Sequence, residues 1–133
     1  MLGSIAVGGV LGAQARYGLG VALPHHAGEW PVATLVINAS GCLLIGVLMV
    51  VITELTRPHP LVRPLLGVGV LGGYTTFSTY STDLVLLWHA GREGAALAYL
   101  VVTPIAALAA VWAGTALTRM VAGALTGGEG TTR

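Results

Sequence analysis

A stretch near the middle of the chain, GGYTTFSTYSTD, gathers aromatic, hydroxyl-bearing and acidic side chains between two apolar runs. Phe77, Tyr80 and Asp83 are spaced i, i+3 and i+6, so on a helix they lie along one side. Hydroxyl groups that could replace water around an ion stand beside them, including those of Ser78 and Thr79. Because aromatic rings have a positive edge, two rings turned edge-on can accommodate an anion. The pattern predicts a polar track with aromatic walls, with simple core packing of the rings as the alternative.

The start of the same stretch predicts an interruption of the helix. Gly72 and Gly73 are weak helix formers, and the hydroxyls of Thr75 and Thr76 compete with the backbone for hydrogen bonds. Non-helical backbone inside a membrane is tolerated where it is buried in protein or lines a hydrated cavity, and its freed carbonyls can hold a cation. A helix that merely kinks at the glycine pair is the alternative.

Other apolar runs carry donors that could serve the same ion. Asn38 lies midway in one run, and Tyr99 and Thr103 lie four residues apart in another. Pro104 follows directly and frees the carbonyl of Leu100, which should kink that helix. Each donor alone could make an ordinary interhelical hydrogen bond, worth about 0.6 kcal/mol on average. Donors on three helices together indicate a path for a hydrated ion.

The composition indicates which elements position these groups. Of 133 residues, 55% are hydrophobic and 8% are charged, whereas about a quarter of the residues in soluble domains are charged. Four apolar runs, each near the ~20 residues that cross a bilayer, occupy roughly residues 2–23, 32–52, 65–88 and 95–117. The connections are short, so consecutive helices should be antiparallel neighbours. The sequence predicts an all-α membrane protein, a single four-helix transmembrane domain over residues 1–133 whose third helix is broken mid-membrane.

One face of the first run carries Arg16 together with Gly8, Gly12 and Gly20 at a spacing of four residues. Such a stripe of small residues lets helices approach closely, either within one chain or between two subunits, and the motif leaves both open. An arginine inside a span costs at least ~2.5 kcal/mol on insertion scales. Arg16 could reach the interface with its long side chain, or stand at the mouth of a water-filled vestibule and attract anions.

Arginines in the connections bear on orientation. Those on the side of the N-terminus are Arg57, Arg63, Arg119 and Arg133, and Arg92 lies opposite. The bias favours a cytoplasmic N-terminus, and because it is small, insertion in both orientations stays open. The single cysteine, Cys42, lies within the second run, where packing is its expected role. No basic cluster indicates a nucleic-acid partner.

Three segments in this order and spacing are recognisable: GGVLGAQARY, TLVINASGCLLIG and GVLGGYTTFSTYS. They resemble the signatures of the small four-helix fluoride channels called Fluc or CrcB. The resemblance implies an antiparallel, dual-topology dimer with two pores in the inner (plasma) membrane. Such a multi-pass protein would export cytoplasmic fluoride passively and reduce fluoride toxicity, with no enzymatic turnover.

The resemblance also implies roles for particular residues. The positions that match the fluoride pore are Asn38, Phe77, Ser78, Thr79, Tyr80, Asp83, Tyr99 and Thr103, and Arg16 matches the vestibule. A structural sodium ion at the dimer centre would be held by the main-chain carbonyls of Gly72 and Thr75 from both subunits. Tyr80 departs from the family, which commonly has phenylalanine there. This departure also fits a heterodimer with a paralogous subunit, so the partner is either a second copy or a related chain.

Other functions are weighed on the same residues. A small proton-coupled multidrug exporter needs a carboxylate within the membrane, and Asp83 is the one acid within the predicted spans. A membrane assembly subunit without transport activity would explain the glycines but not the donors on three helices. An enzyme is not expected, because the histidines lie in or beside loops without a ligand constellation; they are His25, His26, His59 and His89.

Overall fold

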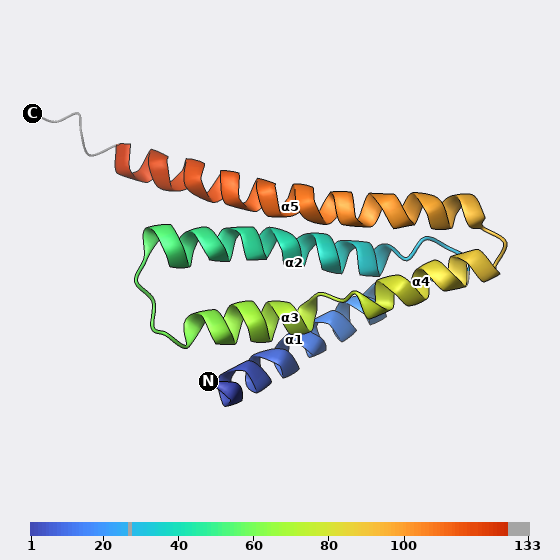
Figure 1. The fold of residues 1–133 in the computed structure, drawn as a ribbon, viewed down its shortest axis with the longest axis horizontal. Coiled ribbons are helices and arrows are strands. Elements are labelled where there is room, and N and C mark those ends of the chain that lie inside the picture. The colour runs from blue at the N-terminus through green and yellow to red at the C-terminus, as the bar shows by residue number, and fades with distance from the viewer. Residues whose placement is uncertain (27, 128–133) are drawn as a thin grey trace, which may run out of the picture.

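The computed structural model describes residues 1–26 and 28–127, and Arg133, placed above on the side of the N-terminus, lies outside them. Helices make up all the regular structure of these residues, without a strand (Figure 1). In chain order they are α1 (Leu2–Ala22), α2 (Val32–Val50), the π-helical η1 (Val51–Leu55) and η2 (Arg63–Leu71), α3 (Gly72–Tyr74), α4 (Ser78–His89) and α5 (Glu93–Gly127). This confirms the predicted all-α class.

Two helical stretches are long and apolar enough to cross a membrane, Val32–Leu55 and Glu93–Leu125. Large apolar side chains are exposed on the outside of the bundle, among them Leu108 at 72% and Trp112 at 73%. Exposed apolar surface on such helices is typical of a protein whose solvent is lipid. The number of spans stays a prediction, because α1 and the interrupted third segment are not among the stretches that meet these criteria.

The last helix continues well past the predicted span end at residue 117. The apolar run ends near Arg119, whereas the helix continues through this residue to Gly127. Arg119 lies on the surface of the helix, where it pairs with Glu54 of η1. The pair is bidentate, with Arg119 Nη2 donating to Glu54 Oε1 at 2.6 Å and Nε to Oε2 at 3.0 Å. Both groups are exposed, so water screens the pair and it adds little to stability.

Glycines let the helices pack backbone to backbone within this chain. α1 lies against η2 and α3, and a Cβ atom added at Gly8 or Gly12 would collide with main-chain atoms of the third segment, including those of Val70. α2 lies along α5 in the same way through Gly46 and Gly114. Gly8 and Gly12 of the stripe therefore pack intramolecularly in this structure, one of the two arrangements that the motif left open, whereas Gly20 faces open space.

The third segment consists of two offset helices. α3 ends at Tyr74, Thr75 has extended backbone (φ −74°, ψ 156°), and α4 begins at Ser78 (Figure 1). α4 then packs against α5 through a small buried cluster formed by Tyr80, Leu87, Ala96 and Tyr99. This arrangement places the non-helical residues between α2 and α1, where polar groups from several elements meet.

Candidate functional site

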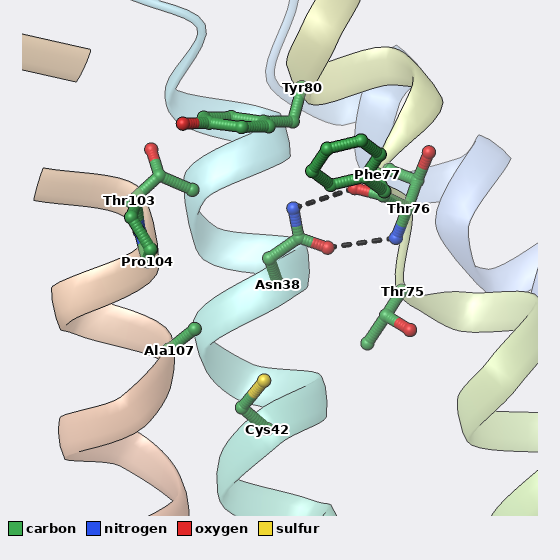
Figure 2. A pocket seen from close by; sticks show the side chains of 9 residues that line it. All are labelled: Asn38, Cys42, Thr75, Thr76, Phe77, Tyr80, Thr103, Pro104 and Ala107. Carbon is green, nitrogen blue, oxygen red and sulfur yellow. Dashed lines mark hydrogen bonds between the residues drawn. The ribbon is translucent and has the colours of Figure 1, made fainter. Parts of the chain in front are cut away.

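A side chain from α2 holds the non-helical backbone in place. Asn38 Nδ2 donates to the Thr76 carbonyl at 2.9 Å, and the Thr76 N–H donates to Asn38 Oδ1 at 2.8 Å (Figure 2). In an uninterrupted helix the Thr76 N–H would donate to the Gly72 carbonyl. The carboxamide thus replaces the helical bond with a pair of bonds across the bundle, which we call the Asn38 clamp. An amide nitrogen has two donors, so one N–H of Asn38 remains for another partner.

A cavity of about 290 Å³ opens beside the clamp. Its lining residues come from α2, the interruption, α4 and α5, and Figure 2 shows them around it: Asn38, Cys42, Thr75, Thr76, Phe77, Tyr80, Thr103, Pro104 and Ala107. The structure therefore brings together four of the predicted pore residues. Thr103 is 4% exposed, and its Oγ1 has no hydrogen-bond partner in the described part of the chain. A buried hydroxyl of this kind is expected to have a ligand or water as its partner.

Aromatic rings form one wall and continue away from the cavity. The ring centroids of Phe77 and Tyr80 are 5.7 Å apart, and those of Tyr80 and Tyr99 are 5.3 Å apart. Trp30 then meets Tyr99 edge-on at 5.8 Å. Phe77, at the open end of this row, is 79% exposed. The Tyr80 hydroxyl is directed toward α5, where it donates to the Leu100 carbonyl at 2.8 Å (Figure 2).

The predicted acid lies at a second polar centre, one turn further along α4. Asp83 is 4% exposed, and its Oδ2 accepts from Thr34 Oγ1 at 2.6 Å and from the Tyr99 hydroxyl at 3.4 Å. Its Oδ1 lies 3.7 Å from Nε2 of His25. The sequence analysis missed this histidine, because only the return of the loop after α1 brings it to the carboxylate. These contacts offset the cost of burying a charge that faces an apolar bundle.

The loop that carries His25 also contains an internal contact. The main-chain N–H of His26 donates to Glu29 Oε2 at 2.9 Å, and the His26 ring lies 3.4 Å from the same oxygen. The main-chain hydrogen bond is the largest of the causes that lower the pKa of Glu29, ahead of the contact with the His26 ring. Glu29 is exposed, so the effect of this contact is local to the loop.

Arg16 faces a third polar region on the other side of the interruption. It lines a cavity of about 370 Å³ together with His25, Thr34 and Thr79. Its Nη1 lies 3.4 Å from the Thr75 carbonyl, which is a long hydrogen bond. The Arg16 side chain is therefore directed toward the interruption within the bundle.

The hydroxyls at the start of α4 divide between this region and the surface. Thr76 Oγ1 donates to Thr79 Oγ1 at 2.9 Å, which places Thr79 beside the cavity of Arg16. Ser78 is exposed, and its Oγ lies 3.4 Å from Thr76 Oγ1. Ser78 lines neither this cavity nor the one beside the Asn38 clamp.

The two carbonyls expected to hold sodium differ in their surroundings. The Gly72 carbonyl lacks its helical donor because the Thr76 N–H is held by the Asn38 clamp. The Thr75 carbonyl instead faces the Arg16 guanidinium, a cation that competes with a metal ion. Hard cations take several oxygen ligands, so two carbonyls from one chain are an incomplete donor set that a second copy could complete. The Gly72 and Thr75 carbonyls therefore fit half of a sodium site, in which the Arg16 guanidinium would compete with the ion for the Thr75 carbonyl.

The chain was compared with known proteins. The family described as CrcB-like protein, Camphor Resistance (CrcB), matches residues 4–115. Fluoride-specific ion channel FluC 1 of Streptomyces coelicolor is 55% identical over 108 residues, which cover 81% of this chain and 70% of the relative. FluC 2 of Nocardia farcinica is 48% identical over 91% of this chain and 86% of its own length. FluC of Rhodospirillum centenum is 43% identical over 90% of this chain and 95% of its own length. The similarity therefore extends over most of the chain.

Proposed function

The chain belongs to the CrcB-like family, and from this premise we propose that it is a fluoride-selective ion channel that lets cytoplasmic fluoride leave the cell passively. Such a protein reduces fluoride toxicity without turning over a substrate, so it is not an enzyme. It lies in the inner (plasma) membrane as a multi-pass protein. The relatives named above are all fluoride-specific ion channels, and they support this function directly.

The observation that carries the proposal in this chain is the donor set around the cavity beside the Asn38 clamp. Fluoride holds its water tightly, so a path for it must offer strong, close donors in place of that water. Thr103 contributes a buried hydroxyl that has no hydrogen-bond partner among residues 1–26 and 28–127, and Asn38 contributes its second N–H. Phe77 and Tyr80 contribute ring edges, which attract an anion weakly and let it move on.

The remaining predicted residues are assigned to the two ends of the path. Arg16 attracts anions at a vestibule, where its charge raises their local concentration. Ser78 and Thr79 start the polar track on α4. Asp83 and Tyr99 continue it toward the loop after α1. Contacts with Thr34 and His25 engage both oxygens of the Asp83 carboxyl group and hold it in place at that end of the track.

We assign the channel an antiparallel, dual-topology homodimer with two pores. Phe77 is exposed at the open end of the aromatic row, and the polar, non-helical backbone beside it needs a protein cover within a membrane. A second, inverted copy supplies that cover and places the interruption of the third segment mid-membrane, at the twofold axis. A paralogous chain in place of the second copy is the alternative.

At that axis the Gly72 and Thr75 carbonyls of both copies would hold a sodium ion. Its positive charge would fix the two interruptions against each other. On this chain, Arg16 must then leave the Thr75 carbonyl or share it with the ion, since both are cations.

Growth of a fluoride-sensitive bacterial strain without its own exporter tests the function in cells. We expect expression of this chain to restore growth in millimolar fluoride, and the Thr103→Val variant to restore less growth at equal membrane levels. Failure of the wild-type chain to restore growth, with the protein present in the membrane, would contradict the proposal. Restoration only after co-expression of a paralogous chain would instead support the heterodimer.

A further inference from the structure

Pro104 leaves an acceptor without its helical donor inside α5. Proline has no N–H, so the carbonyl four residues earlier, that of Leu100, cannot make its helical hydrogen bond. In a membrane each unsatisfied main-chain group is costly, and other groups usually satisfy it. Here the partner comes from another helix, because the Tyr80 hydroxyl of α4 donates to the Leu100 carbonyl at 2.8 Å.

The ring of the same tyrosine also contacts two other aromatic rings. Tyr80 is 8% exposed, and its ring lies between Phe77, tilted at 49°, and Tyr99, tilted at 44°. Ring contacts of this kind permit the ring to slide or rotate, whereas the hydrogen bond to the Leu100 carbonyl directs its far end to one point of α5. The hydroxyl is therefore the directional contact that sets which edge of the ring meets the cavity.

We propose that Tyr80 is a positioning residue: by satisfying the carbonyl that Pro104 exposes, its hydroxyl fixes the ring edge that lines the ion path and keeps its own oxygen out of that path. This inference rests on the proposed fluoride channel for its functional consequence. It also explains how a tyrosine is accommodated in a narrow apolar slot, since a hydroxyl with a dedicated acceptor has no need to bind the passing anion.

The partnership of Tyr80 with Pro104 gives a specific test. Pro104→Ala restores an N–H to α5 and so supplies the Leu100 carbonyl with its helical donor. The Leu100 carbonyl then no longer depends on the Tyr80 hydroxyl for a hydrogen bond. The variants for a double-mutant cycle are Tyr80→Phe, Pro104→Ala and their combination, measured by fluoride and chloride efflux from liposomes and by thermal unfolding in detergent.

We expect Tyr80→Phe alone to lower fluoride efflux about tenfold and to lower the ratio of fluoride to chloride efflux. The tenfold loss is the effect of one unpaired buried acceptor, the Leu100 carbonyl, on the conducting arrangement. In the Pro104→Ala background, the same change should alter efflux less than about twofold. Tyr74→Phe is the matched control, because the Tyr74 hydroxyl bonds Ser40 Oγ at 2.9 Å and has no link to Pro104. Its effect should be equal in both backgrounds.

Two results would overturn the proposal: an unchanged efflux ratio in Tyr80→Phe, or a loss of equal size in the wild-type and Pro104→Ala backgrounds. Should Tyr80→Phe fail to fold, the proposal requires that the combination with Pro104→Ala fold again. Wild-type protein that passes no fluoride would refute the channel itself. In that case thermal unfolding still decides whether the hydroxyl satisfies the Leu100 carbonyl, because the fall in Tm caused by Tyr80→Phe should be smaller in the Pro104→Ala background than in wild type.

Discussion

Replacing Asn38 should damage the interruption of the third segment more than the loss of one polar side chain would suggest. Asn38→Ala removes both bonds of the Asn38 clamp, each worth about 1 kcal/mol net. It also leaves the Thr76 N–H and carbonyl without partners at a residue that is 8% exposed, and an unpaired buried group costs about 1–3 kcal/mol. These are two views of the same loss, so the two unpaired groups together account for about 2–6 kcal/mol. Because these groups lie at the cavity, fluoride efflux should fall together with stability.

A second substitution separates the clamp from simple loss of volume. Asn38→Asp keeps the shape and the acceptor for the Thr76 N–H, but it replaces the donor with an oxygen that faces the Thr76 carbonyl. Two acceptors at the 2.9 Å of the present bond repel each other. Asn38→Asp should therefore be at least as harmful as Asn38→Ala. Ser40→Ala is the control, since Ser40 lies on the same helix and bonds Tyr74 instead of the interruption.

Thermal unfolding in detergent and fluoride efflux from liposomes measure the two effects. For a chain of this size, roughly 3–6 °C of Tm corresponds to each kcal/mol, so Asn38→Ala should lower Tm by on the order of 10 °C. Ser40→Ala should lower Tm by a few degrees at most. A Tm within about 2 °C of wild type for Asn38→Ala, with efflux within twofold, would refute the reasoning that the clamp supports the interruption.

Four further outcomes are expected. Gly12→Ala should destabilise the protein by about 1–3 kcal/mol, because its new methyl group collides with the main chain of the third segment. Gly9→Ala is the control: its methyl group would meet open space, so Tm should stay nearly unchanged. Thr103→Val should keep or raise Tm, since the lost hydroxyl has no hydrogen-bond partner in the part of the chain that the structure describes, while fluoride efflux falls. Efflux equal to that of wild type would remove Thr103 from the path. A small methanethiosulfonate reagent should block efflux by reacting with Cys42 in the cavity, and Cys42→Ala should resist it; block of both proteins would place the reactive site elsewhere. Hydrogen bonds from His26 lower the pKa of Glu29, so their contribution to stability is present above the ordinary glutamate pKa and is lost as pH falls through the lowered value. Wild type and Glu29→Gln should therefore converge in Tm on acidification. A gap in Tm that widens on acidification would contradict this.

Much of the fold could be predicted from periodicity and composition alone. Long apolar runs with few charges allow few structures besides helices, and the start of α1 and α2 matched the predicted runs within a residue. The end of α5 did not, because an apolar run ends at a charge whereas a helix ends only where its backbone bonds stop. Nothing in the apolar pattern separates η2 from an α-helix, since both bury the same kind of face.

The candidate site was predictable as a set of residue types but not as a set of bonds. Asn38 and Tyr80 stand out because polar groups are rare in apolar runs. The rotation of each helix about its axis decides that Asn38 bonds Thr76 and that the Tyr80 hydroxyl bonds the Leu100 carbonyl. Hydrophobic periodicity does not determine these rotations. His25 gave no signal at all, because a histidine in a loop has the same pattern whether it is solvated or lies 3.7 Å from a buried carboxylate.

Fluoride efflux from liposomes that contain only this purified chain tests the central claim most directly. A fluoride electrode follows release under a concentration gradient, and chloride release is measured under the same gradient. The account predicts rapid fluoride release with far slower chloride release, from the wild-type chain without any other subunit. Folded protein that releases neither ion, or releases both at the same rate, would contradict it.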